Sequence, residues 1–323
     1  MTFPWPRACA AAPVTAVFKR TAEDFRVREA LAFEPSGGGE HLYLRLEKTD
    51  VATPFLADEI ARGFDVAPVA VGYAGMKDRR SVAEQWFSVS TSRDAAAFPC
   101  IDGVRLLNAT RHPRKLRKGQ LAGNHFDIYL RDLGEGDWER RLQSVAAHGA
   151  PNYFGPQRFG GNNLDAALAW LPKRRRVRIS RFKQSLYLSV LRSYLFNEVL
   201  GTRVEAGNWN QPVSGEVLEE GTEVATPTGP LWGRGRSAAV GTAAEIESAA
   251  LFVHRELLAL LEHAGLKQDR RSLVLRPTEL VWRPHEGGLK ISFRLRPGGY
   301  ATALLREAFA LMEPKMQPDK ATP

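Results

Sequence analysis

The sequence predicts an α/β protein in which a mixed-sheet domain is interrupted by a second domain. Alternating apolar residues, typical of strands, fill the first half of the 323-residue chain, and helical spacing dominates the middle. An alternating segment then returns near the C-terminus. One sheet interrupted by a helical insertion accounts for this order, and the chain is long enough for two domains.

The predicted strands of the first half are short alternating segments. The clearest runs from His41 to Lys48, where Leu42, Leu44 and Leu46 share one face. The others span residues 24–31, 69–74, 104–109 and 125–131, and a further strand begins near Trp86. Close to the C-terminus, residues 291–295 show the same alternation.

The helices are predicted from apolar spacing and from capping residues. Thr53 is a candidate N-cap, with Pro54 at the first helical position and Gly63 near the end. Further helices are expected over residues 137–148, 184–200, 244–264 and 302–312. Residues 151–161 are rich in aromatic residues and glycine and favour irregular structure, and the tail from Pro314 is expected to be disordered.

The charge balance favours a polyanionic partner. The formal net charge is +9, which points first to nucleic acid and second to an anionic membrane. No run approaches the roughly 18 apolar residues that a membrane helix needs. Cys9 and Cys100 match no metal or redox spacing and the histidines form no metal-binding cluster, so we expect a cytoplasmic protein without a bound metal.

One turn combines a carboxylate with several cations. Asp78 lies beside Lys77, Arg79 and Arg80, between two predicted strands. Gly75 would allow a positive φ or a close backbone approach, so that the turn presents Asp78 outward. Nearby cations favour the ionised carboxylate, which could act as a nucleophile or base. The alternative is an aspartate that bonds its own turn in a solvated loop.

Two further segments are strongly basic. The nine residues from Arg111 to Gly119 include Arg114, Lys115, Arg117 and Lys118. Residues 173–183 carry seven cations with Phe182 among them. Either segment could be a solvated loop, but in a chain of this charge both suit RNA, since cations contact phosphates and an aromatic ring can stack on a base.

Several motifs, in order along the chain, resemble one family. Residues 19–29, KRTAEDFRVRE, are similar to the opening K-x-x-x-E-D-F-x-V-x-E signature of the TruD family of tRNA pseudouridine synthases. Later family motifs match GEH at 39–41, AGMKDR at 74–79, QW at 85–86, GNHF at 123–126, PNYFGPQRFG at 151–160 and PGGYAT at 297–302. The resemblance covers nearly the whole chain.

The resemblance implies a fold and a reaction. The family isomerises uridine 13 in the D arm of certain tRNAs to pseudouridine without a cofactor. Its mixed-sheet catalytic domain would comprise residues 1–148 and 276–323, and the inserted TRUD domain residues 149–275. A tRNA partner and a monomer are expected, with no membrane and no protein partner.

The resemblance also implies site residues. The essential aspartate falls on Asp78 and the active-site lysine on Lys19, as its ion-pair partner. The nucleotide-contacting positions fall on Phe25, Asn124 and Tyr300, where phenylalanine is more usual than this tyrosine. The stacking phenylalanine falls on Phe126.

These residue types suit a uridine that has been turned out of an RNA stack. Period-2 alternation alone makes Phe25 and Phe126 core residues, and Asn124 stands in a Gly-Asn turn, where its amide could bond the backbone or read uracil. Asp78 could attack the substrate covalently or take the C2′ proton. Lys77, Arg79 and the four cations of residues 111–119 are the candidate RNA-backbone contacts.

Two rival functions remain open at this point. A noncatalytic RNA-binding protein or RNA chaperone would also need the charge and the aromatic residues, but not Lys19, Asp78 and Asn124 within their motifs. A small-molecule hydrolase explains neither the basic segments nor the absence of an evident second catalytic carboxylate or nucleophilic serine.

Overall fold

The computed structural model describes residues 4–9, 11–160 and 162–314. These form two compact units, each described here by itself. The sheet unit comprises the described residues of Val14–Gly136, Pro277–Gly298 and Phe309–Pro323. The helical unit comprises those of Met1–Pro13, Asp137–Arg276 and Gly299–Ala308. The predicted family domains, with an insertion at 149–275, stay a prediction, and the tail from 315 onward lies outside the described residues.

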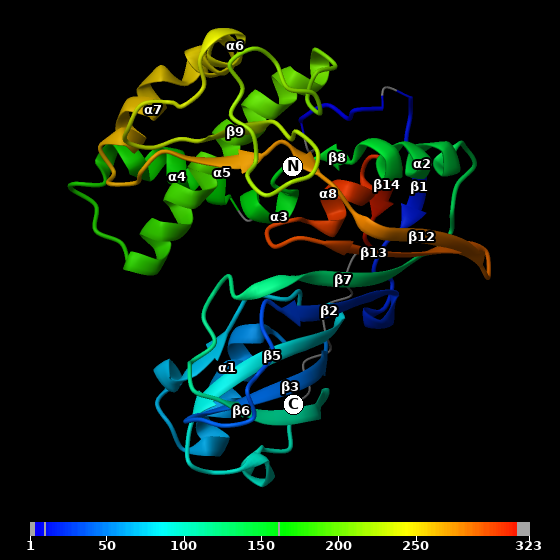
Figure 1. Ribbon diagram of the computed structural model, residues 1–323, viewed down its shortest axis with the longest axis vertical. Helices are drawn as coiled ribbons and strands as arrows, with labels where there is room; N and C mark the ends of the chain where they lie inside the picture. Colours follow the sequence, from blue (N-terminus) through cyan, green and yellow to red (C-terminus); the bar gives the residue numbers. More distant parts are fainter. Residues whose placement is uncertain (1–3, 10, 161, 315–323) are drawn as a thin grey trace. The chain divides into compact units, whose positions relative to one another are not determined.

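The sheet unit contains one large mixed sheet and one small sheet (Figure 1). Its strands and α-helix are β1 (Val14–Val17), β2 (Phe25–Leu31), β3 (His41–Thr49), α1 (Thr53–Phe64), β4 (Val71–Tyr73), β5 (Val82–Ser90), β6 (Val104–His112), β7 (Leu121–Leu130), β12 (Thr278–His285), β13 (Gly288–Leu295) and β14 (Phe309–Met312). Three short 3₁₀ helices, Ala22–Asp24, Pro68–Ala70 and Ala95–Ala97, connect them.

The large sheet has the strand order β12-β13-β7-β2-β5-β3-β6, and β4 pairs with β5 beside this path. The β2–β5 pair is parallel and the other neighbours are antiparallel, so the sheet is mixed as predicted. Leu42, Leu44 and Leu46 of β3 pack on α1 through Leu56 and Ile60. This cluster forms a core on one face of the sheet.

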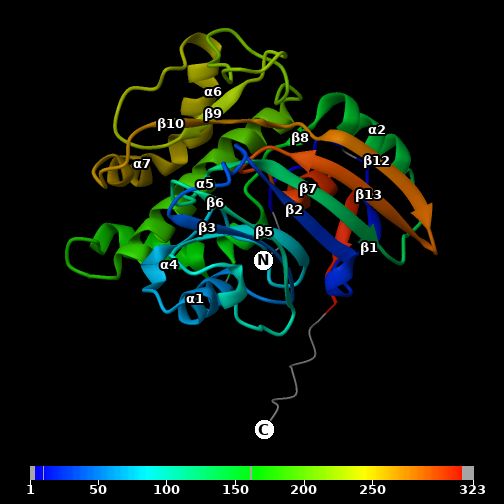
Figure 2. The ribbon, with the colours of Figure 1, turned by 60° about the horizontal axis from the view of Figure 1, so that its bottom comes forward.

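The helical unit is built around the long helix α5 (Figure 2). Its elements are α2 (Trp138–His148), β8 (Ala150–Pro151), α3 (Pro156–Phe159), α4 (Asn163–Trp170), a 3₁₀ helix (Leu171–Lys173), α5 (Arg181–Glu205), β9 (Thr228–Leu231), α6 (Gly241–Leu251), a 3₁₀ helix (Phe252–His254), α7 (Arg255–Glu262), β10 (Asp269–Ser272), β11 (Val274–Leu275) and α8 (Ala301–Leu305).

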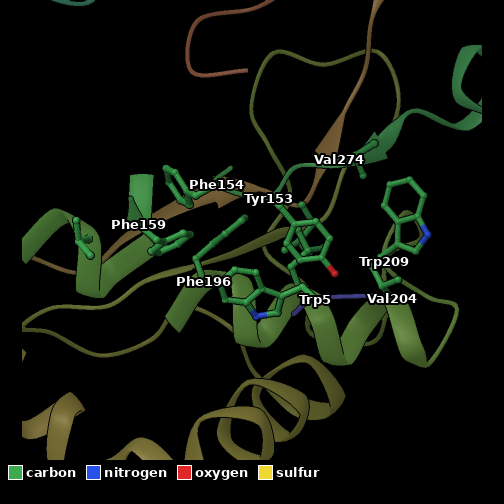
Figure 3. Packing of buried hydrophobic residues seen from close by; sticks show 11 residues of the cluster. Trp5, Tyr153, Phe154, Phe159, Phe196, Val204, Trp209 and Val274 are labelled. Carbon is green, nitrogen blue, oxygen red and sulfur yellow. The ribbon is translucent and has the colours of Figure 1, made fainter. Parts of the chain in front are cut away.

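Aromatic side chains of residues 151–160 form part of this unit's core (Figure 3). Tyr153, Phe154 and Phe159 are buried and pack with Trp5 and Phe196. The segment was predicted to be irregular, and residues 152–155 are, but Pro151 ends β8 and residues 156–159 form the single turn α3. In the described part of the chain no helix is long and apolar enough to cross a membrane.

Two predicted helices were wrong. Residues 244–264 form α6 and α7 with a 3₁₀ turn between them. In one straight helix Leu251 and Leu261, ten residues apart, would lie about 80° apart around the axis, and the turn lets both enter one cluster. The second error is residues 309–312, which form β14 and pair in parallel with β1, burying Phe309. Tertiary pairing outweighs local helix propensity there.

Smaller corrections concern two ends of elements. Helix α1 begins at Thr53 itself, its cap residue is Ala52, and the Thr53 side chain makes no cap bond. The hydroxyl instead bonds the Asp78 turn, as described below. The strand predicted over 69–74 is only Val71–Tyr73, because a 3₁₀ turn that starts at Pro68 precedes it.

Candidate active site

Asp78 stands in the turn that joins β4 to β5, and buried polar groups hold the backbone of that turn. The Asp78 carbonyl accepts hydrogen bonds from Lys48 Nζ at 2.9 Å and Ser81 Oγ at 2.7 Å. Gln85 Nε2 donates to the Gly75 carbonyl at 2.7 Å, and Lys77 N donates to Thr53 Oγ1 at 3.1 Å. The backbone is therefore fixed while the Asp78 side chain remains 55% exposed.

The conformational role predicted for Gly75 was wrong. It has no positive φ, and an added Cβ would meet nothing nearer than Lys77 Nζ at 4.0 Å. The turn keeps its shape through side-chain bonds to its carbonyls and amides.

The cation that meets Asp78 comes from a distant part of the sequence. Lys19 Nζ lies 2.5 Å from Asp78 Oδ2. Lys19 is buried, its Nζ lies 4.1 Å from the centroid of the Phe25 ring, and its φ of 55° is in the left-handed region. Such a φ costs a residue other than glycine about 1–3 kcal/mol. The surrounding packing therefore holds Lys19 in a strained position that aims its ammonium at Asp78.

The three cations beside Asp78 in sequence bond elsewhere. Lys77 is buried and forms an ion pair with Glu29 of β2. Arg79 Nε donates to the Asp50 carbonyl at 3.2 Å, and Arg80 donates to the Arg20 carbonyl at 2.7 Å. The burial of Lys77 argues against its predicted contact with the RNA backbone, because a buried ammonium cannot reach a phosphate.

Lys48 is a buried cation under the turn. Its ammonium donates to the carbonyls of Val51, at 2.7 Å, and Asp78. Burial lowers the Lys48 pKa from 10.5 to about 8, although the nearby Asp78 charge opposes that change. Lys48 belongs to the machinery that positions the Asp78 backbone.

The two predicted phenylalanines lie together on one face of the sheet. The ring centroids of Phe25 on β2 and Phe126 on β7 are 5.8 Å apart, and Phe126 stacks on Phe293 at 5.3 Å. Both predicted rings are buried, as the alternation indicates. Since Lys19 lies over Phe25, the aromatic cluster adjoins the Asp78–Lys19 pair.

Asn124 lies inside β7 and not in a turn before it. It pairs with Glu29 of β2 and Leu295 of β13, so its side chain shares the face of Phe126, two residues along. Its Oδ1 is buried and has no hydrogen-bond partner within the described residues. A buried acceptor without a partner is costly, which makes this oxygen available for a donor on a ligand.

The remaining predicted residues lie outside this cluster. Tyr300 belongs to the helical unit, where its ring packs 6.2 Å from that of Phe154. Arg114, Arg117 and Lys118 are exposed, whereas Lys115 is half-buried and its ammonium bonds the Val69 carbonyl. No group of three or more metal-ligating side chains occurs among the residues with a described position.

The predicted site omitted the buried polar residues Glu29, Lys48, Thr53 and Gln85. For two of them the sequence carried a signal. Lys48 continues the apolar face of Leu42, Leu44 and Leu46, and Glu29 likewise follows Phe25 and Val27 at a spacing of two. A charged residue on an apolar strand face is rarely buried unless it is paired, and here both have partners.

Fold and site define a mixed α/β protein with an exposed carboxylate, paired with a lysine, beside buried aromatic rings. The family model for tRNA pseudouridine synthase D (TruD) matches residues 8–168. Curated relatives named tRNA pseudouridine synthase D include one from Aeromonas salmonicida, 43% identical with 90% of each chain covered. A second, from Methylococcus capsulatus, is 42% identical and covers 97% of this chain and 96% of its own. The chain belongs to the TruD family of tRNA pseudouridine synthases.

A solved structure shares the fold. It is a chain from Methanosarcina mazei assigned to tRNA pseudouridine synthase D, with a TM-score of 0.69 over 94% of this chain and 95% of its own. The sequence identity is only 22%, so this likeness supports the architecture alone.

Proposed function

We propose that this protein isomerises uridine 13 in the D arm of tRNA to pseudouridine, without a cofactor and with Asp78 as the catalytic carboxylate. Family membership supports the reaction class. The single observation that supports the residue is the exposed Asp78 carboxylate, held by a fixed backbone and by the ammonium of Lys19. The family motifs select this carboxylate, and it lies next to the aromatic cluster of Phe25 and Phe126.

In this proposal the uridine leaves its stack before reaction, at a cost of roughly a few kcal/mol. Phe126 and Phe25 support the displaced base, and stacking returns about 1–3 kcal/mol per base. The Asn124 Oδ1 atom accepts a hydrogen bond from the N3–H of uracil. Tyr300 is the predicted contact from the helical unit.

Asp78 has two chemical routes. It can attack the substrate as a nucleophile, or it can take the C2′ proton so that a glycal forms as uracil departs. In both routes the bond from C1′ to N1 breaks, a bond from C1′ to C5 forms, C5 loses its proton and N1 gains one. In the glycal route the proton taken from C2′ is returned to that carbon when the new bond forms, so the overall change is an isomerisation. The Lys19 ammonium keeps the carboxylate oriented and compensates its charge.

The substitution Asp78→Asn tests the assignment. We expect it to abolish turnover, because an amide is neither a nucleophile nor a base, while tRNA affinity stays within about tenfold, since phosphate contacts dominate affinity. Asp102→Asn is the matched control, because this carboxylate is also exposed and lies in the same unit.

Activity is measured on unmodified tRNA transcripts by mapping pseudouridine through carbodiimide-dependent stops of reverse transcription. The expected stop reports position 13, and a transcript in which cytidine replaces uridine 13 is the negative control. Equal loss of binding and activity in Asp78→Asn would mean that Asp78 is structural. Intact RNA binding with no stop in any transcript would favour a noncatalytic RNA-binding protein.

A further inference from the structure

The segment Lys173–Lys183, which runs from the 3₁₀ helix after α4 into the first turn of α5, is called the basic linker here. It lies at the rim of the helical unit in Figure 2. Between Asp165 and Glu198 the chain has no acidic residue at all, so no neighbour in sequence balances this charge. Its cations are Lys173, Arg174, Arg175, Arg176, Arg178, Arg181 and Lys183.

The cations of the basic linker have no carboxylate partners within the residues that the structure describes. Arg174 bonds only a backbone carbonyl, that of Leu171 at 3.3 Å. Buried arginines of the same unit do have carboxylate partners, as in Arg203–Glu216 at 2.7 Å and Arg270–Glu247 at 2.5 Å. Mutual repulsion in the basic linker is therefore uncompensated, and the fold gains no ion pair from these residues.

The start of α5 carries charges of the wrong sign for helix stability. Arg181 and Lys183 occupy the first turn, which has no acidic residue, although the positive end of the helix dipole favours carboxylates. Ser180 caps the helix by accepting from Lys183 N at 3.2 Å. Lys183 thus stands where a capping box would place glutamate or glutamine. The sequence here opposes the helix dipole, which suggests selection for another purpose.

The same turn exposes an aromatic side chain. Phe182 is 77% exposed, and Val177 in the preceding loop is 45% exposed. An exposed phenylalanine flanked by Arg181 and Lys183 provides a ring face next to phosphate-binding groups. That combination suits an unstacked base with its adjoining phosphates. An anionic membrane fits less well, because the next apolar residues of α5, such as Tyr187 and Val190, are buried in the protein.

We infer that the basic linker is a second RNA-docking surface, which binds phosphates and stacks an unpaired base of the tRNA through Phe182. This inference rests on the proposed function for the identity of the RNA. It concerns a surface of the helical unit, whereas Asp78 and its partners belong to the sheet unit.

The test uses the full-length protein and an unmodified tRNA transcript, with binding measured over a range of salt concentrations. In one variant Arg175, Arg176, Arg178 and Arg181, all exposed, become Gln. We expect binding at least about tenfold weaker, with the slope of log K against log salt reduced by about 3 for four lost phosphate contacts. The matched control replaces four exposed cations of the same unit, Arg234, Arg236, Arg255 and Lys267, by Gln and should stay within about twofold.

The aromatic contact has its own pair of variants. Phe182→Ala should weaken binding by about fivefold or more, whereas Phe182→Tyr, which keeps the stacking ring, should bind as the wild type does. Thermal melting of the Phe182 variants should match the wild type, because this side chain is exposed. The four-arginine variant should melt no lower than the wild type, because the removed charges are exposed, repel one another and, at Arg181, oppose the helix dipole. Loss of affinity in the Tyr variant would contradict stacking.

The outcomes separate this inference from the proposed function. A wild-type protein that binds tRNA but isomerises no transcript contradicts the proposed function, and the binding variants still test the basic linker. Unchanged binding in the four-arginine variant, or an equal loss in the control, overturns the inference. Wild-type binding to phosphatidylserine vesicles that the same variant abolishes, with tRNA binding unaffected, would identify a membrane surface instead.

Discussion

Lys48 shows how a buried charge can hold the backbone of a turn at the cost of stability. Its side chain is fully buried and two backbone carbonyls accept its hydrogen bonds. With a pKa of about 8 in the fold and 10.5 when unfolded, it binds its proton less tightly in the folded protein. The charged form therefore opposes folding, and this penalty is complete below about pH 8.

This shift gives a prediction for stability against pH. Between about pH 8 and 10.5 the unfolded chain holds a proton that the folded protein has lost, so the Lys48 contribution to the free energy of unfolding rises with pH. Methionine in Lys48→Met does not titrate. Relative to this variant, the free energy of unfolding of the wild type should rise by about 2 kcal/mol between pH 7 and 9.5. Urea unfolding of both proteins at several pH values measures this difference, and a constant difference would contradict it.

At the residue scale the sequence predicted one contact of Asp78 and misjudged others. The family motifs selected Lys19 and Asp78, and their side chains meet. Proximity in sequence wrongly suggested that Lys77, Arg79 and Arg80 surround the carboxylate. The direction of a side chain depends on the backbone of its turn and on partners from other strands, which local sequence does not encode.

At the scale of elements, the loop between β6 and β7 is the basic surface of the sheet unit. Arg114, Arg117 and Lys118 are exposed on it, whereas Lys115 binds the carbonyl of Val69. The loop also has an internal anchor, because Leu116 is buried and its amide donates to Ser88 Oγ at 2.9 Å. An anchored loop presents its cations with little loss of entropy on binding.

Replacing Arg114, Arg117 and Lys118 by Gln should weaken tRNA binding and reduce its salt slope by about 2–3, because three phosphate contacts are lost. Salt-dependent binding measurements test this. Lys115→Gln is the matched control, because it removes a charge of the same loop whose ammonium already bonds the Val69 carbonyl. This variant should leave the salt slope nearly unchanged. An unchanged slope in the triple variant would exclude the loop from the interface.

The sequence predicted most strands of the large sheet correctly, but it predicted the last elements of the chain less well. Alternation identified β2, β3, β6, β7 and β13, and all of these but β6 have one buried and one more exposed face. It missed β12, and it gave β14 the wrong type. The latter exists through parallel pairing with β1, about three hundred residues earlier, and alanine, leucine and methionine locally favour a helix.

At the scale of the whole molecule, the two units are interleaved along the chain. Six segments alternate between them, so the chain passes from one to the other five times. Neither unit is a continuous fragment. Composition does not indicate that α8 belongs to the helical unit, nor that residues 4–9 and 11–13 do. Each unit nevertheless carries its own exposed basic surface: the loop between β6 and β7, and the basic linker.

The two surfaces lead to a prediction about the complete protein. If both hold the same tRNA, the variant that combines the three sheet-unit substitutions with the four basic-linker substitutions should lose the sum of the two binding free energies. The slope of its log K against log salt should fall by about 5–6, because each of the seven neutralised phosphate contacts lowers that slope by a little under one. The surfaces belong to different compact units and share no described partner, which is the condition for additivity. Salt titrations of the wild type, both separate variants and the combination complete the cycle. A combined loss no larger than the greater single loss would contradict two independent contacts, because the second set of substitutions would then remove no further binding free energy.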